Sequence, residues 1–394
     1  MEQSSGNFFK EKSTQVVNAI VKDRFFQKFI SNYWWEILLY AIVFSVVFYF
    51  FQYRYNIVNR QLRKMLPLQD YQTDLTSLVN SQDIMNEDAD FRLSDFWIAS
   101  SYKTYLVNKY SGKVDIDMIN MTLRLGCRFI DLDIFSSGGQ TPIPVVANGI
   151  VENGVIVSDR LLFEDVIKSL STSAFSSRLK NGKDPLFINL NMDGIIKDDD
   201  MVKTVAKILT EYLGKTFVGE DYIRQGRDTN KNFALIPIKQ LLKRNTTVLL
   251  SSSNVQGTPI DNIINACSAT MANLRYRNIN QVNGITDVEE MMRFNKQTLT
   301  VVTPNYNGPS DSRENYNWMS SMLMGCQFSC INYNIGKDDE LLSEYIDRFS
   351  GYSMLVKPLK LRYSPVLIPA PLAQNKEVSF APKSVITPDG SINV

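Results

Sequence analysis

The feature that most constrains this chain is an apolar run near its N-terminus, YWWEILLYAIVFSVVFYFFQY at residues 33–53. As a helix these 21 residues would be about 31 Å long, which matches a hydrocarbon core of roughly 30 Å. Glu36 is the only charge in the run, and the aromatic residues at both of its edges are typical of membrane interfaces. We therefore expect a single transmembrane helix rather than the buried helix of a soluble domain.

The charges on either side of this run do not decide its orientation. Three basic residues precede it and four follow it, namely Lys22, Arg24 and Lys28, then Arg54, Arg60, Arg63 and Lys64. This difference is too small for the positive-inside rule. The four cysteines (Cys127, Cys267, Cys326 and Cys330) form no disulfide framework, so we expect the body of the chain on the cytosolic, reducing side of the membrane.

Composition divides the chain into five segments. We expect an N-terminal segment (1–32), the transmembrane helix (33–53), a polar juxtamembrane linker (54–95), a globular body (96–362) and a proline-rich tail (363–394). From residue 67 onward the linker is polar and acidic, which indicates a tether or an amphipathic connector. The tail carries five prolines and no hydrophobic period, which indicates either a disordered segment or an extended arm that lies along a partner.

Within the body, short apolar runs alternate with amphipathic stretches. The runs predict strands at 128–135, 142–146, 186–190, 247–252, 298–302 and 328–333, and the stretches predict helices at 117–125, 163–171, 199–213, 286–294 and 314–324. Strands that alternate with helices indicate parallel βα units and an α/β fold. The net charge of +1 gives no sign of nucleic-acid binding.

Several short motifs of the body follow one another in a familiar order. They are Ser101-Tyr102-Lys103-Thr104-Tyr105, Gly126 to Asp133, Pro144 to Gly149, Phe163 to Ile167, Pro304 with Asn315 to Trp318, Gly325 to Gln327 with Asn332, and Gly351 to Arg362. In these places the chain resembles the catalytic barrel of phosphoinositide-specific phospholipase C, over residues 96–362. The resemblance implies a distorted TIM-type (β/α) barrel, here preceded by a single transmembrane helix, with its site at the C-terminal ends of the strands.

The resemblance implies two catalytic histidines, but the chain contains no histidine. In the family one histidine acts as a base on the inositol 2-hydroxyl, and a second stabilises the transition state and protonates the leaving group. Tyr102 stands at the first place and Asn148 at the second. A tyrosine with an ordinary pKa of about 10 is a poor base at neutral pH, and an asparagine side chain exchanges no proton. We therefore expect both positions to be catalytically degenerate.

The calcium ligands that the resemblance implies are altered as well. Lys103 stands where the family has an asparagine ligand, whereas Asp131 and Asp133 match an acidic pair. A later carboxylate ligand corresponds to Asn191, and Asp193 follows two residues further on. Because Ca²⁺ prefers about six to eight oxygen ligands, we expect a vestigial cluster in which a salt bridge from Lys103 replaces the metal, and no cofactor.

These changes together predict a catalytically inactive protein. A general acid or base contributes about 10²- to 10⁴-fold in rate, so the loss of both leaves little activity. We expect a scaffold component of a membrane-associated assembly, which contacts the bilayer through 33–53 and protein partners through the barrel surface and the tail. The abundance of Asn, Ile, Lys and Tyr suits an AT-rich genome, either that of a protist or that of a large DNA virus, where the protein would link a membrane to a capsid.

Two alternatives stay open at this point. The first is a module that binds phosphoinositide headgroups without cleaving them. The second is a phosphodiesterase that works without histidine and uses Asp131 or Asp133 as a base with a raised pKa.

Overall fold

The computed structural model describes twelve stretches of the chain. These are residues 24–65, 75–107, 112–149, 151–152, 155–156, 159–219, 222, 232–268, 274–305, 314–335, 339–365 and 384–393. The chain forms two compact units, Met1–Arg362 and Tyr363–Val394.

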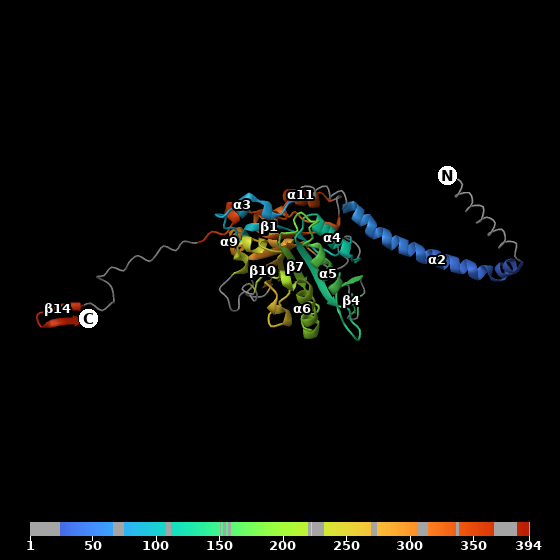
Figure 1. Cartoon of the computed structure of the whole chain (residues 1–394), viewed down its shortest axis with the longest axis horizontal. Helices are drawn as coiled ribbons and strands as arrows, with labels where there is room; N and C mark the ends of the chain where they lie inside the picture. The colour runs from blue at the N-terminus through green and yellow to red at the C-terminus, as the bar shows by residue number, and fades with distance from the viewer. Residues whose placement is uncertain are drawn as a thin grey trace. The chain divides into compact units, whose positions relative to one another are not determined.

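A mostly parallel sheet curves into a nearly closed barrel in the first unit (Figure 1). Neighbouring strands along it are β10 (Leu274–Asn278), β11 (Leu299–Thr303), β12 (Phe328–Ile331), β1 (Phe96–Ser101), β2 (Phe129–Ser136), β7 (Leu186–Asn191), β8 (Thr247–Ser251) and β9 (Ala266–Cys267), and each pair is parallel. Antiparallel additions are β13 (Met354–Val356) on β1, β3 (Pro144–Ala147) on β2, and β6 (Arg160–Leu162) on β3. This topology confirms the predicted TIM-type barrel.

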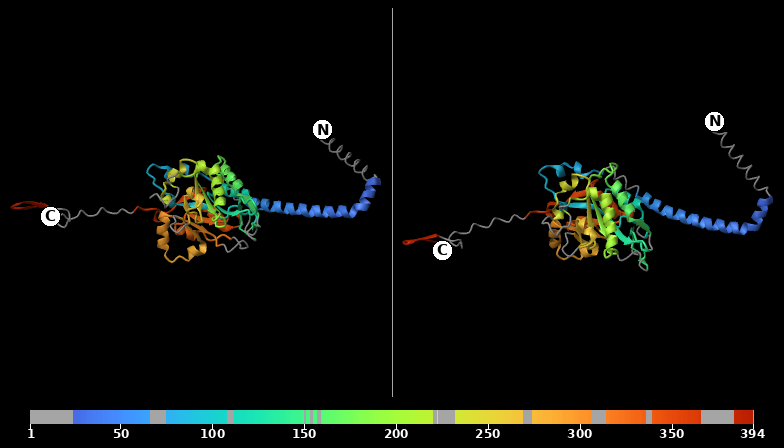
Figure 2. Two further views of the ribbon diagram at one scale, coloured as in Figure 1. Left: turned by 90° about the horizontal axis from the view of Figure 1, so that it is seen from below. Right: turned by 60° about the horizontal axis from the view of Figure 1, so that its bottom comes forward.

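Helices surround the strands in all three views (Figure 1 and Figure 2). The longer ones are α4 (Ile116–Arg124), α5 (Phe163–Ser173), α6 (Asp199–Leu213), α9 (Val288–Gln297) and α11 (Glu340–Arg348), and the shorter ones are α3 (Gln82–Met85), α7 (Ile238–Leu242), α8 (Ile279–Asn283) and α10 (Met319–Leu323). Four of the longer helices begin at an aspartate whose carboxylate accepts a backbone N–H of the first turn, namely Asp115, Asp198, Asp287 and Asp339. Such caps fix where each helix starts.

Aromatic side chains fill the inside of the barrel. The ring of Phe328 lies 4.7 Å from that of Phe129 and 5.4 Å from that of Phe187, centroid to centroid, and all three side chains are fully buried. Two further hydrophobic clusters lie between the strands and the surrounding helices. The barrel is therefore a packed core, and any site has to be built at one of its ends.

Buried cations close the end of the barrel at which the parallel strands begin. Arg128, fully buried before β2, donates to the carbonyl oxygens of Ala174 at 2.7 Å, Asp184 at 2.5 Å and Pro185 at 3.3 Å. Lys357, also fully buried, donates from Nζ to two further carbonyls, those of Ser94 and Gly325, at 2.6 Å each. We call this end the base of the barrel and the opposite end the mouth.

The segment that enters the barrel is packed against this base. The buried carboxylate of Asp184 accepts from Ser77 Oγ at 2.5 Å, from the Leu78 N–H at 2.9 Å, and from Ser353 Oγ. Gly126 has a φ of +94°, and a Cβ there would lie 2.8 Å from the side chain of Leu75. The described part of the predicted tether, residues 75–95, therefore packs onto the barrel, because its few apolar side chains are buried there.

The helix α2 (Arg24–Met65) contains the apolar run. Its stretch Asn32–Tyr53 is long and apolar enough to cross a membrane, and none of it is buried within the protein. The helix continues twelve residues beyond Tyr53 to Met65, so the start of the predicted linker is helical. Near that end Ile57 and Leu62 pack against the second hydrophobic cluster.

The second unit contains a β-hairpin that the sequence reading did not predict. Strands β14 (Ser384–Thr387) and β15 (Gly390–Asn393) pair in antiparallel register around Pro388 and Asp389. This corrects the expectation of a tail without secondary structure. The Pro-Asp-Gly sequence that forms the turn is a known turn signal, so the hairpin was readable from the sequence.

Candidate functional site

The residues singled out in the sequence lie around the mouth of the barrel, beside the C-terminal ends of β1, β2 and β7. In the register between β2 and β7, Asp131 is opposite Asn189 and Asp133 is opposite Asn191. Because alternate residues of a strand point to the same side, these four side chains share one face of the sheet. Lys103 follows the end of β1, the strand that pairs with β2 on its other edge.

Lys103 contacts both aspartates. Its backbone N–H donates to Asp131 Oδ2 at 3.0 Å, and its Nζ lies 2.6 Å from Asp133 Oδ2. The side chains of this ion pair are only 8% and 6% exposed, for Lys103 and Asp133 respectively. The backbone φ of Lys103 is 42°, a left-handed conformation that residues with a Cβ adopt rarely. The turn after β1 thus places one ammonium group directly on the acidic pair.

Asp131 is the more buried of the two aspartates, at 2% exposure against 4% for Asp133. Its Oδ1 accepts from Asn189 Nδ2 at 2.8 Å, and its backbone N–H donates to Thr104 Oγ1 at 3.0 Å. Burial, followed by repulsion from the Asp133 carboxylate, raises the pKa of Asp131 above its ordinary range, although the bonds from Asn189 and Lys103 oppose this shift. The protonated form of Asp131 is therefore favoured more than in an exposed aspartate.

The Asp133 carboxylate has more hydrogen-bond and ion-pair partners than the Asp131 carboxylate. Besides Lys103, it accepts from the Tyr105 hydroxyl at 2.9 Å and from Asn191 Nδ2 at 3.1 Å. Burial and the two nearby aspartates raise the pKa of Tyr105 well above its ordinary value, so this phenol stays protonated and remains a donor. One ammonium, one phenol and one amide thus satisfy this carboxylate.

Tyr102 and Asn148, the two positions at which the sequence analysis expects lost catalytic histidines, lie at the same end of the barrel but in different surroundings. Tyr102 is 8% exposed, belongs to the hydrophobic cluster inside the barrel, and has the Lys103 ammonium 5.8 Å from its ring centre. Asn148 follows the end of β3 and is 2% exposed, yet neither its Nδ2 nor its Oδ1 has a hydrogen-bond partner among the described residues. Asp193 is exposed and does not join the cluster.

These side chains do not suit a calcium ion. The Lys103 ammonium lies against Asp133, the Lys103 backbone N–H is bonded to Asp131, and both asparagines turn their Nδ2 rather than an oxygen towards the acids. No group of three or more acidic or cysteine side chains with metal-binding geometry exists in the described parts of the chain. Ca²⁺ requires several oxygen ligands with net negative charge, which this arrangement does not offer.

The sequence analysis did not assign three members of this cluster to the site, namely Thr104, Tyr105 and Asn189. A signal for Asn189 was present, because it precedes Asn191 by two residues in a strand and must therefore face the same side. Tyr105 and Thr104 gave no comparable signal, since their contacts depend on how the turn after β1 folds back over β2.

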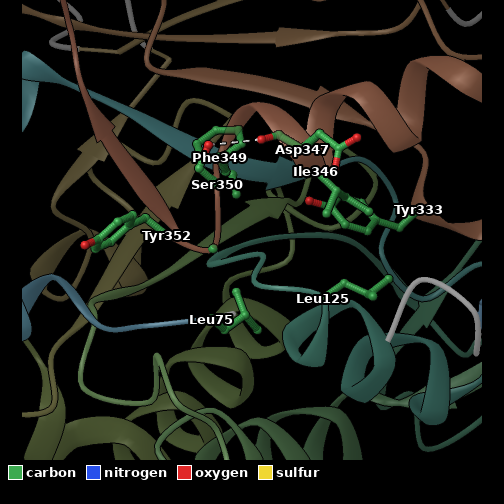
Figure 3. Close-up of a pocket in the computed structure, with 10 residues that line it drawn as sticks. Leu75, Leu125, Tyr333, Ile346, Asp347, Phe349, Ser350 and Tyr352 are labelled. Atoms are coloured by element: carbon green, nitrogen blue, oxygen red, sulfur yellow. Dashed lines mark hydrogen bonds between the residues drawn. The ribbon is translucent and has the colours of Figure 1, made fainter. Parts of the chain in front are cut away.

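A separate cavity of about 320 Å³ lies between the end of α11 and the end of α4 (Figure 3). Leu75, Leu125, Tyr333 and Phe349 are among its lining residues, and none of the mouth cluster reaches it. Its lining is more apolar than polar, and Asp347 is the only carboxylate among its lining residues. We therefore place the candidate site at the mouth.

Comparison with known proteins agrees with this geometry. Residues 89–244 match the family model "Phosphatidylinositol-specific phospholipase C, X domain". The chain carries a phospholipase C-like barrel. Two solved structures share this fold, those of PLC21 from S. officinalis and from L. pealei. Their TM-scores are 0.56 and 0.55 and their sequence identities 18% and 16%, over 73% of this chain and 39% and 40% of theirs.

Sequence relatives of the phospholipase C-like barrel include proteins named as phosphodiesterases and one named as inactive. The 1-phosphatidylinositol 4,5-bisphosphate phosphodiesterase eta-2 of Mus musculus is 27% identical over 161 residues, which is 40% of this chain and 9% of that protein. The "Inactive phospholipase C-like protein 2" of Homo sapiens is 29% identical over 153 residues, which is 38% of this chain and 12% of that protein. The chain thus spans only about a tenth of the length of these relatives.

Proposed function

We propose that this protein is a catalytically inactive phospholipase C-like module, held at a membrane by α2, that serves as a scaffold for partner proteins. The observation that carries the proposal is the Lys103–Asp133 ion pair, with Nζ 2.6 Å from Oδ2 and both side chains buried. This pair puts a positive charge directly against Asp133, one of the two carboxylates that the sequence analysis expects as metal ligands. A metal-assisted attack on phosphate needs such carboxylates free to bind a dication.

The proton-transfer groups support the same conclusion. The chain contains no histidine, and the Asn148 side chain exchanges no proton. Tyr102 lies within the hydrophobic cluster inside the barrel, next to a lysine rather than a base. A phosphodiester cleavage step in this barrel would therefore lack both histidines that the resemblance implies, and only the aspartates of the mouth would be left for proton transfer.

The membrane part of the proposal rests on α2. Its stretch Asn32–Tyr53 is apolar over its whole length and not buried, which suits a single crossing of the bilayer.

We propose that protein partners bind the barrel surface and the tail of residues 363–394. Crosslinking and mass spectrometry of the full-length protein, extracted in mild detergent from its native source, would identify a stoichiometric partner; recovery without any protein partner would argue against a scaffold.

A hydrolysis assay tests the loss of activity. The full-length protein in mixed micelles is given phosphatidylinositol or its 4,5-bisphosphate with Ca²⁺, and inositol phosphate release is measured. We expect turnover slower than about 10⁻³ per second, because losing both an acid and a base removes several orders of magnitude. Turnover near one per second would overturn the proposal and favour a histidine-free mechanism through Asp131 or Asp133.

A set of restored variants separates the missing histidines from the missing metal. We expect Tyr102→His/Asn148→His to remain inactive, because Lys103 still occupies the acidic pair. The same variant combined with Lys103→Asn is the matched comparison, since it differs only in the cation. Activity in the double variant while Lys103 is present would show that the ion pair does not prevent catalysis.

A second candidate function is the binding of phosphoinositide headgroups without cleavage, and one observation favours it. The Asn148 amide is 2% exposed and lacks hydrogen-bond partners among the described residues, so it offers a donor and an acceptor at the mouth. If a headgroup binds there with Lys103 as its cation, Lys103→Ala should weaken binding to phosphoinositide-doped vesicles. Equal binding by Lys103→Ala and the parent protein would exclude the mouth as the binding site.

A further inference from the structure

A polar pocket lies on the outside of the barrel, where α4 and α5 end. Its volume is about 240 Å³, and its walls come from the last turn of α4, the last turn of α5 and the connection that leads towards β7. In a (β/α) barrel the helices run opposite to the strands, so the C-terminal ends of the helices lie at the base. This pocket and the mouth cluster are therefore at opposite ends of the barrel.

Two arginines line this pocket with no partner of their own. Arg124, from the last turn of α4, and Arg178, from the connection after α5, are both exposed. Neither guanidinium forms a hydrogen bond or an ion pair with any residue in the parts of the chain that the structure describes. Each guanidinium presents five N–H donors in a planar fork that matches the oxygens of a phosphate or carboxylate.

Two neutral donors complete the pocket. Asn120 Oδ1 accepts from Ser169 Oγ at 3.3 Å, which leaves the Nδ2 group of Asn120 available. Ser176 Oγ accepts from the Arg178 N–H at 3.3 Å, and its own hydroxyl proton has no acceptor among the described residues. The pocket lining contains no aspartate and no glutamate. Its charge is therefore positive and its free groups are donors.

Neutralisation of the helix ends does not account for these arginines. A helix C-terminus carries partial negative charge on its unpaired carbonyls, which attracts cations. Here the carbonyls of Met121, Thr122 and Leu123 at the end of α4 already accept backbone N–H groups. At the end of α5 the carbonyl of Ala174 accepts from Arg128 at 2.7 Å. Arg124 and Arg178 thus remain uncommitted.

We propose that this pocket binds a phosphate group, as the headgroup of an anionic phospholipid or as a free phosphate compound. Two arginine forks and two neutral donors match the several oxygens of a phosphate, and the absence of a lining carboxylate removes the main source of repulsion. This assignment concerns a different end of the barrel from the mouth and does not depend on the loss of catalysis there.

Calorimetry on the full-length protein in neutral detergent micelles tests the proposal. The probes are inorganic phosphate, pyrophosphate, and dihexanoyl phosphatidic acid below its critical micelle concentration. The test variant is Arg124→Gln/Arg178→Gln. The matched control is Lys207→Gln/Arg293→Gln, which removes the same charge from two exposed side chains of α6 and α9 that form no hydrogen bond or ion pair among the described residues.

We expect saturable binding of at least one probe by the parent and by the control, and at least tenfold weaker binding by Arg124→Gln/Arg178→Gln. Binding of phosphatidic acid alone would identify a lipid headgroup as the ligand, and equal binding of pyrophosphate would identify a free phosphate compound. The proposal is overturned if no probe binds saturably, or if the test variant and the control bind equally. Equal melting temperatures of the two variants would exclude misfolding as the cause of a loss.

Discussion

Two buried lysines at opposite ends of the barrel are held in contrasting ways. At the mouth, Lys103 places its ammonium 2.6 Å from the Asp133 carboxylate, beside a second carboxylate. At the base, Lys357 donates to two backbone carbonyls at 2.6 Å and forms no ion pair among the described residues. Burial lowers the pKa of Lys357 to about 7, although Cys326 and Asp95 oppose the shift.

The mouth thus holds its buried lysine by an ion pair, whereas the base holds its buried lysine by hydrogen bonds to backbone carbonyls. Lys357 joins the start of β1 to the start of β12 whether or not it is protonated, since a neutral amine still has two N–H donors. Lys103, in contrast, acts through its positive charge, because it lies beside two buried acids, Asp131 and Asp133. We therefore expect the mouth to depend on charge and the base to depend on hydrogen bonding.

The largest effect is expected from Lys103→Met. This change removes the cation from Asp131 and Asp133, and breaking one side of a buried ion pair costs about 3–5 kcal/mol. The free energy of unfolding, from urea titration of the full-length protein in detergent, measures it. Lys103→Met/Asp133→Asn should recover part of this loss, because that variant no longer buries an unpaired carboxylate at position 133. A loss below about 1 kcal/mol in the single variant would mean that the ion pair does not stabilise the mouth.

A smaller and pH-dependent effect is expected from Lys357→Met. The variant leaves the carbonyls of Ser94 and Gly325 without a donor, which costs roughly 1–3 kcal/mol. Folding lowers the pKa of Lys357 in the parent protein. The unfolded state therefore binds more protons than the folded state between about pH 7 and pH 10, and the free energy of unfolding of the parent rises with pH in that window.

Urea titrations at pH 7 and pH 9.5 check this expectation. The loss caused by Lys357→Met should be larger at pH 9.5, since the parent is free of the penalty for a buried charge there. Lys360→Met, an exposed lysine three residues further on, is the control and should change little at either pH. A loss that does not vary with pH would show that Lys357 keeps its proton in the fold.

The smallest effect, of opposite sign, is expected from Asp131→Asn. Folding raises the pKa of Asp131, so the folded state binds more protons above pH 4 and parent stability falls as pH rises towards that raised pKa. The variant removes this penalty, and Asn189 can rotate its unpaired Oδ1 to accept from the new amide. We expect a gain of about 1 kcal/mol at pH 8 and none at pH 4. A loss at pH 8 would show that the Asp131 charge is needed to hold Lys103.

Much of this architecture was readable from the sequence where its pattern was strongly periodic. The strand predicted at 186–190 is β7 with one further residue, and the helix predicted at 199–213 is α6 with the same ends. The helix predicted at 314–324 is only α10, residues 319–323, because the residues before it lie outside regular secondary structure, where Asn315 and Tyr316 donate to the carbonyls of Asn332 and Val302. Strand β10 and helix α11 were missed, since neither contains a long apolar run.

The site was predictable in part. The sequence motifs placed Lys103, Asp131, Asp133 and Asn191 at the end of neighbouring strands, and the structure brings their side chains into contact. Asp193, which the sequence analysis groups with this cluster, lies beyond the end of β7 and is exposed. The base of the barrel gave no sequence signal, because Arg128, Asp184 and Lys357 are far apart in the chain and bind mainly backbone atoms.

The left-handed backbone at Lys103 and the charge of its side chain favour different residues at this position. Lysine and asparagine codons differ only at the third base, and asparagine tolerates a φ of 42° better than lysine does. A single base change would thus relax the backbone and supply an amide oxygen, yet it would also strand two buried acids without a cation. The backbone of this turn therefore favours asparagine at position 103, whereas the two buried acids beside it favour lysine.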